Sequence, residues 1–221
     1  NIAACALGGA QDALDRAFAY VQEREQFGRA IIDFQATQFK LADMETELAA
    51  ARALMEREGL DTTHDLQGWT IAKLAAIVAE NGQRPAAWEE AAEGSNGGIG
   101  HNAILFSWTG QDKGLTAAHA GYDVVMTPAQ NVYLDMAHTD DPDDWGASWA
   151  AFVSLADTIR WDPCPDPAIA NRIIGVQGTF WSEFTTQDAQ IWPMLIPRIF
   201  GVAVKAWQED DLTEDRFLSL C

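Results

Sequence analysis

Residues 173–183, Ile-Ile-Gly-Val-Gln-Gly-Thr-Phe-Trp-Ser-Glu, combine a β-branched run with an indole ring and a carboxylate two residues apart. Such a run is typical of a buried parallel strand, whose C-terminal end would carry Trp181 and Glu183. Barrel enzymes place their chemistry at such strand ends. A sugar site needs both groups, because sugar C–H faces stack on indole and sugar hydroxyls donate to carboxylate oxygens. Taken alone, a core tryptophan beside a surface glutamate explains the motif equally well.

Three further strand-like runs end in aromatic or acidic residues. They are Arg84–Glu90, which ends in Trp88-Glu89-Glu90, Asn102–Trp108, and Tyr122–Asp135, which ends in Tyr133-Leu134-Asp135. Core packing hardly explains four such ends on successive strands, whereas an aromatic cage lined with hydrogen-bond acceptors does. We therefore expect the rings of Trp88, Trp108, Tyr133 and Trp181 to converge on one pocket.

The intervening segments predict the elements that would position these residues. Helical spacing of apolar residues predicts helices at 2–24, at 33–58 with Asp33 as its N-cap, at 65–80, at 115–120 and at 193–207. Residues 128–167 read as one long, acidic, solvated loop. Strands alternating with helices predict a parallel sheet with right-handed crossovers. The outer strands of such a sheet would leave open edges prone to self-association.

Composition excludes several functional classes. The net charge of −19 repels phosphate backbones, so we expect no nucleic-acid partner. The three Cys and four His residues lack ligand spacing, so we expect no metal site. No apolar run approaches the roughly 20 residues of a membrane span. The acidity fits a salt-adapted or secreted protein, in the bacterial periplasm or outside the cell. The sequence starts at Asn1 without a leader and therefore predicts no compartment.

Several short motifs in the second part of the chain occur in a characteristic order and spacing. They are Trp88-Glu89-Glu90, Ser107-Trp108, Gly121–Pro128, Tyr133-Leu134-Asp135, Gly146–Ala150 with Trp149, Gly175–Glu183, and Pro197-Arg198 followed by Trp207. In these motifs the chain, from about residue 55 onward, resembles the second half of the catalytic barrel of family-20 glycoside hydrolases, the β-N-acetylhexosaminidases. The resemblance implies an α/β fold for residues 56–221, a partial (β/α)8 TIM barrel of about four parallel strands with helices.

The resemblance also implies a reaction and a set of site residues. Family-20 enzymes remove terminal GlcNAc or GalNAc by substrate-assisted retaining hydrolysis, in which the acetamide oxygen of the substrate attacks the anomeric carbon. The hydroxyl of Tyr133 would donate to that oxygen and orient the acetamide. The substrate-binding residues would be Trp88, Trp108, Trp149 and Trp181 as stacking rings, with Asp135 and Glu183 as acceptors for sugar hydroxyls. Trp145 is the alternative to Trp149 as the stacking ring from the long acidic loop.

The catalytic Asp-Glu pair of the family is missing from this sequence. In the family it follows a His-x-Gly-Gly run one strand earlier than Trp88, and no Gly-Gly-Asp-Glu occurs here. Glu89 and Glu90 do not replace it, because they match the next strand. We therefore expect a glycosidase by family whose isolated chain is inactive. Arg198 is expected to form a structural ion pair under the barrel.

The first 55 residues carry a different set of motifs. They are Tyr20–Arg29, Phe34-Gln35, Lys40–Met44 and Ala50–Arg52. These resemble the C-terminal helical domain of acyl-CoA dehydrogenases and imply an α-helical hairpin over residues 1–55. By this resemblance Arg24, Gln26, Phe27 and Gln35 would touch the flavin (FAD) of a neighbouring subunit. The main flavin cradle and the catalytic Glu of that family are absent, so we expect no cofactor. FAD is expected only under the alternative hypothesis that the chain is an acyl-CoA dehydrogenase fragment.

The two resemblances make the chain a junction of two partial domains, joined near residues 51–55. Composition agrees, because all nine tryptophans lie at or after Trp69. Three readings remain open. The chain is a piece of a β-N-acetylhexosaminidase that binds N-acetylhexosamine-terminated glycans, a fragment of a flavin-dependent acyl-CoA dehydrogenase, or a non-functional fusion. Coverage favours the first reading for the family, and the missing acid favours the third for the isolated chain.

Overall fold

The computed structural model describes residues 2–94, 96–207, 213, 216, 217 and 219, with side chains from residue 9 onward. Two of the three cysteine side chains, those of Cys5 and Cys221, lie outside this part. The chain forms two compact units. Unit 1 contains residues 1–77 and 91–99, and unit 2 contains residues 78–90 and 100–221. This division does not test where the two resemblances meet, so the joint near residue 55 stays a prediction.

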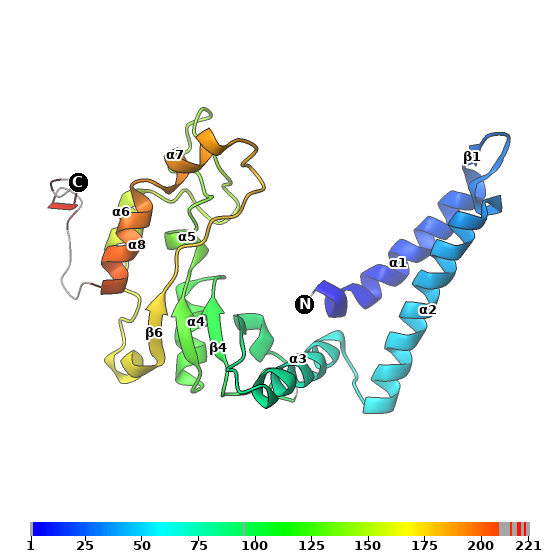
Figure 1. Ribbon diagram of the computed structural model, residues 1–221, viewed down its shortest axis with the longest axis horizontal. Coiled ribbons are helices and arrows are strands. Elements are labelled where there is room, and N and C mark those ends of the chain that lie inside the picture. The colour runs from blue at the N-terminus through cyan, green and yellow to red at the C-terminus, as the bar shows by residue number, and fades with distance from the viewer. Residues whose placement is uncertain (1, 95, 208–212, 214–215, 218, 220–221) are drawn as a thin grey trace. The chain divides into compact units, whose positions relative to one another are not determined.

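Unit 1 is built on an antiparallel helical hairpin, drawn in blue and cyan in Figure 1. Its elements are α1 (Ile2–Glu23), β1 (Glu25–Gln26), β2 (Arg29–Ala30), the 3-10 helix η1 (Ile31–Asp33) and α2 (Gln35–Glu58). The two short strands pair across a turn that places Phe27 and Gly28 at positive φ. A core cluster in unit 1 consists of Leu14, Val21, Leu41 and Leu48 of the hairpin together with Leu66. Leu41 and Leu48, seven residues apart in α2, therefore face the partner helix α1.

The capping of α2 differs from the prediction. Asp33 lies in η1, and the N-cap of α2 is Phe34, which makes no side-chain cap hydrogen bond. The chain turns through η1 before α2 begins, which moves Asp33 one residue too early to cap it. The helix runs unbroken through residues 51–55 and ends at Gly59, which has φ 65°. A left-handed residue after the last turn is the usual helix stop, and glycine adopts it without strain.

The rest of unit 1 is α3 (Thr63–Glu80) up to residue 77, together with residues 91–99, which include part of the 3-10 helix η2 (Glu89–Ala92). In this loop, Glu93 and Gly94 pack tightly against α3 at Gly68. A side chain at Gly68 would approach the carbonyl oxygen of Glu93 to 3.1 Å and the Cα of Gly94 to 3.2 Å.

Unit 2 contains a four-stranded parallel sheet in the order β3-β4-β5-β6. The strands are β3 (Ala86–Trp88), β4 (Ile104–Ser107), β5 (Asp123–Met126) and β6 (Ile173–Val176). Each strand is shorter than the run that predicted it, because the residues beyond its end leave the ladder and form the site. The fold of this unit is α/β, a partial (β/α)8 barrel, as the sequence predicts.

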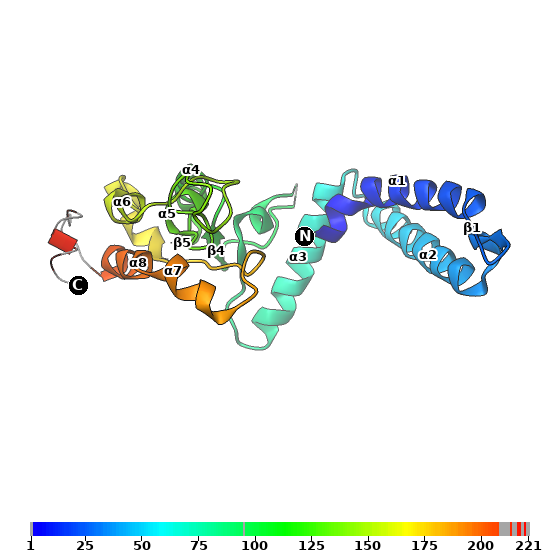
Figure 2. The ribbon, with the colours of Figure 1, turned by 90° about the horizontal axis from the view of Figure 1, so that it is seen from above.

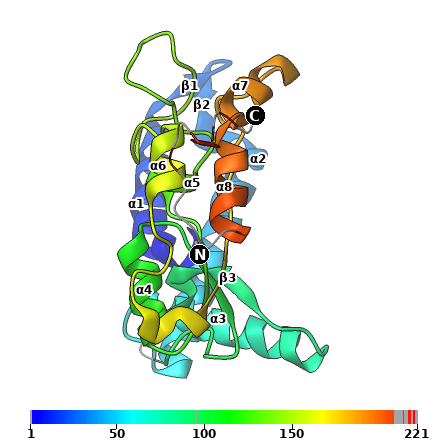
Figure 3. The same cartoon turned by 90° about the vertical axis from the view of Figure 1, so that its left-hand side faces the viewer.

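Helices accompany the strands in unit 2. They are α4 (Gln111–His119), α5 (Ala129–Val132), α6 (Leu155–Arg160), η3 (Pro167–Arg172), η4 (Asp188–Gln190), α7 (Ile191–Leu195) and α8 (Arg198–Trp207). Among them α4 packs against β4 and β5, and α8 packs against β6, which gives the sheet a helical layer. Helix α4 lies so close that a side chain at Gly114 would meet Met126 and Ser107. Leu105, Ser107, Val124 and Met126 point toward this layer and are fully buried. Figures 2 and 3 show α6 and α8 side by side on this unit.

Two predictions about the helices are wrong. The segment 128–167 is not one loop, because it contains α5 and α6. Ser154 caps α6 through a reciprocal capping box with Asp157, a signal present in the sequence but obscured by its acidic surroundings. The helix expected at 193–207 is divided into α7 and α8, because Pro197 has no N–H to continue the helical hydrogen bonds.

The N-terminal ends of the strands are held together by one carboxylate. Asp123, the first residue of β5, accepts hydrogen bonds from Arg84 at 2.6 Å and from Arg172 at 3.0 Å. Arg84 precedes β3 and Arg172 precedes β6. These hydrogen bonds hold the pKa of Asp123 below its usual value. The clamp thus links both outer strands to the centre of the sheet, at the end opposite the site.

Within the part of the chain that the structure describes, no helix is both long and apolar enough to cross a membrane.

Candidate active site

Tyr133 is the centre of the predicted site, and main-chain pairing fixes its position. After β5 the chain makes the short helix α5 and returns to an extended conformation at Tyr133, which bridges to Thr179 beyond β6. Leu134 N–H donates to the Thr179 carbonyl at 2.7 Å, and Thr179 N–H donates to the Val132 carbonyl at 3.0 Å. The main chains at Tyr133 and Thr179 therefore continue the pairing of β5 with β6 beyond the ends of these strands. This continuation places Tyr133 and Trp181 at the same end of the sheet.

Three aromatic rings meet around Tyr133. The ring centroids of Trp108 and Tyr133 lie 6.4 Å apart in a stacked arrangement. Trp149 makes edge contacts with both, at 5.9 Å from each centroid. Trp149 rather than its rival Trp145 joins this cluster. Trp145 instead donates its indole N–H to the carbonyl of Phe184 at 2.6 Å, which ties the acidic loop to the loop after β6.

A second pair of rings joins the first three. The centroids of Trp88 and Trp181 lie 6.2 Å apart, although Trp88 ends β3 and Trp181 follows β6, the two outer strands of the sheet. The chain beyond β6 therefore brings Trp181 to the end of β3. The Trp181 side chain forms a hydrogen bond with the Tyr133 hydroxyl, in which the indole N–H is the donor. The rings of Trp88, Trp108, Tyr133 and Trp181 therefore lie close together, while a pocket between them and their roles stay predictions.

Glu89 and Glu90 have structural roles that the sequence did not reveal. The buried carboxylate of Glu89 accepts from Trp108 N–H at 2.7 Å, from Thr109 N–H at 2.9 Å and from the Thr109 hydroxyl. Glu90 accepts from the indole N–H of Trp108 at 2.9 Å. The end of β3 thus fixes both the main chain and the ring orientation at the end of β4. Two acids directly after a site tryptophan were the available signal.

Asp135 lies beneath the rings and is only 3 % exposed. The main-chain N–H groups of Asp135 and Trp181 donate to its carboxylate, yet burial dominates and raises its pKa. Its Oδ1 atom is buried and has no protein hydrogen-bond partner. A buried acceptor without a donor is costly unless a ligand supplies one. Glu183 is exposed, and its charge adds to the rise in the pKa of Asp135.

Tyr133 is itself buried, and burial raises the pKa of its hydroxyl to about 12. The charges of Asp135, Glu89 and Glu90 act in the same direction. The phenol therefore keeps its proton at neutral pH. Because Trp181 uses an acceptor position of the hydroxyl, the Tyr133 proton is free to be donated to a ligand.

Arg198, the first residue of α8, supports the site from below. Its guanidinium is fully buried and donates to the carbonyls of Leu134 at 2.9 Å, Met136 at 2.8 Å, Val153 at 2.8 Å and Met194. Burial lowers its pKa to about 10, which leaves it charged at neutral pH. The expected ion pair is replaced by carbonyl contacts, with Asp144 and Asp135 acting only as more distant charges. Arg198 is structural, as predicted, but by a different interaction.

A tight glycine contact completes the floor of the site. Gly146 has φ 142°, and a side chain there would lie 2.6 Å from the Ala137 nitrogen and 2.8 Å from the Asp135 carbonyl. Ala147 on one side donates to the Asp135 carbonyl at 2.8 Å. Only glycine lets the acidic loop pack this closely against the Asp135 main chain.

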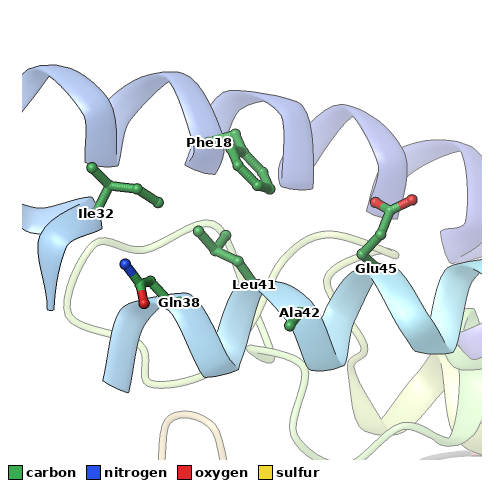
Figure 4. A pocket seen from close by; sticks show the side chains of 6 residues that line it. All are labelled: Phe18, Ile32, Gln38, Leu41, Ala42 and Glu45. Atoms are coloured by element: carbon green, nitrogen blue, oxygen red, sulfur yellow. The ribbon is translucent and has the colours of Figure 1, made fainter. Parts of the chain in front are cut away.

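The candidate flavin residues do not form a cradle. Arg24, Gln26, Phe27 and Gln35 are all exposed, Phe27 at 93 %. Unit 1 has an apolar hollow of about 380 Å³ between α1 and α2, shown in Figure 4. Its lining residues are Phe18, Ile32, Gln38, Leu41, Ala42 and Glu45, and they include none of the four candidates. No group of acids, histidines and cysteines among the described residues has the arrangement of a metal site.

Comparison with known proteins shows the family of the chain. The model of the glycosyl hydrolase family 20 catalytic domain matches residues 41–210. The chain belongs to glycosyl hydrolase family 20. Among its relatives is a beta-hexosaminidase of Vibrio furnissii, 30 % identical over 157 residues, which are 69 % of this chain and 25 % of that protein. A solved inactive mutant of the GH20 exo beta-N-acetylglucosaminidase of Vibrio harveyi superposes with a TM-score of 0.69 at 29 % identity. The superposition covers 77 % of this chain and 27 % of that one.

The family-20 assignment does not account for the whole chain. The acyl-CoA dehydrogenase C-terminal domain model matches residues 1–77. A probable acyl-CoA dehydrogenase of Bacillus subtilis is 56 % identical over 55 residues, which are 25 % of this chain and 14 % of that protein. Both recognised resemblances are therefore confirmed, and the chain is a chimera in sequence. It spans about a quarter of the length of the hexosaminidase relative.

Proposed function

We propose that unit 2 is the sugar-binding half of a β-N-acetylhexosaminidase site and that it binds terminal GlcNAc or GalNAc of glycans. The observation that carries the proposal is the cluster of Trp88, Trp108, Tyr133, Trp149 and Trp181 around one protonated phenol. Indole faces bind the apolar face of a pyranose, and the phenol donates to an acetamide oxygen. The named activities of the relatives fit this ligand.

The residues of the chain act on the acetamide rather than on the leaving group. A Tyr133 hydrogen bond would hold the acetamide oxygen beside the anomeric carbon, where it attacks in substrate-assisted hydrolysis. Asp135 Oδ1, which lacks a protein donor, would accept from a sugar hydroxyl. Glu183, exposed at the rim, would accept from another. Because this sequence contains no Gly-Gly-Asp-Glu run to supply the general acid, binding without turnover follows.

Two assays test this function. Intrinsic tryptophan fluorescence titrated with N-acetylglucosamine should saturate with a dissociation constant of roughly 1 mM or weaker, since only half a cage is present. Glucose, which lacks the acetamide, should bind at least several-fold more weakly. A chromogenic N-acetylglucosaminide should not be cleaved above the blank. The absence of a fluorescence response, or the same response to both sugars, would refute the binding proposal. Cleavage of the chromogenic substrate would refute the claim that the chain lacks a general acid.

We propose that the site uses no cofactor. The absence of the dehydrogenase family's main flavin cradle and catalytic Glu from this sequence supports this. Purified protein with flavin absorbance would revive the dehydrogenase reading. We also propose that the chain associates with itself through the open edges of its sheet, as expected from the strand pattern.

A further inference from the structure

The sheet of unit 2 ends in two open edges of matching direction. β3 and β6 are its outer strands, all four strands are parallel, and neither outer strand has a second strand partner among the described residues. A parallel barrel becomes closed when its first and last strands pair, and the common closed form has eight strands. Four strands supply half of that number. The Trp88–Trp181 contact joins the end of β3 to the chain that follows β6.

The inner face of the sheet is poorly covered. In β4 and β5 the residues facing the helices, such as Leu105 and Val124, are completely buried. Their neighbours on the other face, such as Phe106 and Val125, are only half-buried. A side chain added at Gly175 in β6 would meet nothing within 4 Å. In a closed barrel this face would be packed with side chains from the opposite strands.

Apolar side chains are also exposed along the β6 edge. Helix α8 packs against β6, as Figure 1 shows. Ile174 in β6 is 48 % exposed, and Ile199 and Phe200 in α8 are 40 % and 49 % exposed. In a barrel the last helix also covers the strand that pairs with the last strand. These side chains are therefore placed to cover an additional strand at the β6 edge.

We propose that the strand partner is a second copy of this chain, and that two copies form a closed eight-stranded barrel around a two-fold axis. β6 of each copy would pair with β3 of the other at two equivalent seams. The inference rests on the proposed self-association and specifies its form. A second copy fits because its edges are complementary in direction and because four plus four strands close the ring after one repeat.

The net charge sets the conditions for closure. Each copy carries a formal charge of −19, so two copies repel each other at long range. Salt screens this repulsion while leaving main-chain pairing and apolar contacts intact. The dimer should therefore strengthen as the ionic strength rises from about 0.01 M to 0.15 M, a range over which the screening length falls from about 30 Å to 8 Å.

Sedimentation equilibrium of the full chain measures the outcome. The expected result is a species of twice 24.2 kDa that does not grow further with concentration. Ile174→Lys should weaken the dimer at least tenfold, because it places a charge in the β6 seam. Phe39→Lys is the matched control, since Phe39 is 60 % exposed on the hairpin helix α2 and lies outside the seams. The control should dimerise like the parent chain.

Hydrogen exchange gives a second readout that needs no variant. Amides of residues 86–88 and 173–176 should become more protected as the concentration of the parent chain is raised. A monomer at all concentrations would overturn both self-association and closure. Mass that keeps increasing beyond two copies would show open-edge polymers and overturn closure alone. A dimer lost in Phe39→Lys but retained in Ile174→Lys would move the interface to the hairpin.

Discussion

The hydroxyl of Tyr133 links the rings of the site to its chemistry. A phenol on the surface exchanges its hydrogen bonds with water, whereas this one accepts from Trp181 and is buried. Its pKa of about 12 keeps the proton in place over the whole neutral range. The residue therefore presents a single donor in a fixed direction, which is what orientation of an acetamide oxygen requires.

Tyr133→Phe removes this donor while keeping the ring. We expect binding of N-acetylglucosamine to weaken about fivefold, the equivalent of ~1 kcal/mol for one neutral hydrogen bond. Binding of glucose should hardly change, because glucose has no acetamide for the phenol to hold. Fluorescence titrations with both sugars measure the difference. Equal losses for the two sugars would show that the hydroxyl only supports the rings.

Asp135→Asn tests the buried carboxylate through its pH dependence. Because burial raises the pKa of Asp135 in the folded protein, the native state binds its proton more tightly than the unfolded state does. The parent chain thus loses stability as pH rises from about 4, the unfolded pKa, through the raised folded pKa. The variant lacks this loss. The difference in unfolding free energy should therefore shift in favour of the variant between pH 4 and 7, as measured by urea unfolding. A pH-independent difference would contradict the burial argument.

The sequence predicted the aromatic residues of the site better than it predicted the hydrogen bonds that hold them in place. Trp88, Trp108, Tyr133 and Trp181 could be found because strand ends of a parallel sheet share one edge. The contacts of Glu89 with Trp108 and Thr109 could not, because they join residues about 20 positions apart through a turn whose shape the sequence does not specify. The apolar periodicity of residues 193–207 did not show that α7 and α8 are separate, although Pro197 inside this range was an available signal for the break. The alternation of strands and helices predicted the fold class, but it did not predict the residues at which each element ends.

Among the elements, α8 has more influence on the site than its distance in sequence suggests. Its first residue, Arg198, donates to three main-chain carbonyls between α5 and α6, those of Leu134, Met136 and Val153. These carbonyls belong to the loop that carries Tyr133 and Asp135. A planar guanidinium can donate to several of them at once, whereas an ammonium is a point donor.

Arg198→Lys should therefore destabilise unit 2 by about 3 kcal/mol, because buried carbonyls are left without donors. Sugar binding should weaken even at temperatures where the variant is folded, since Tyr133 and Asp135 lose their support. Arg172→Lys is the control, because its half-exposed side chain can keep a charge pair with Asp123. Urea unfolding and sugar titration of both variants provide the comparison. A similar small effect of both changes would mean that the carbonyls find other donors.

For the whole molecule, the two units have separate cores and contain different numbers of tryptophans, whose fluorescence reports unfolding. Unit 1 contains Trp69 alone, while the other eight tryptophans lie in unit 2. The hairpin core rests on five buried residues, whereas unit 2 has a sheet buried on its helix side. Small cores support little stability, so unit 1 should unfold at a lower temperature than unit 2. Far-ultraviolet circular dichroism, which reports helix in both units, should begin to fall before tryptophan fluorescence changes. Coincident curves would show one cooperative transition and would mean that the chimera folds as a single domain.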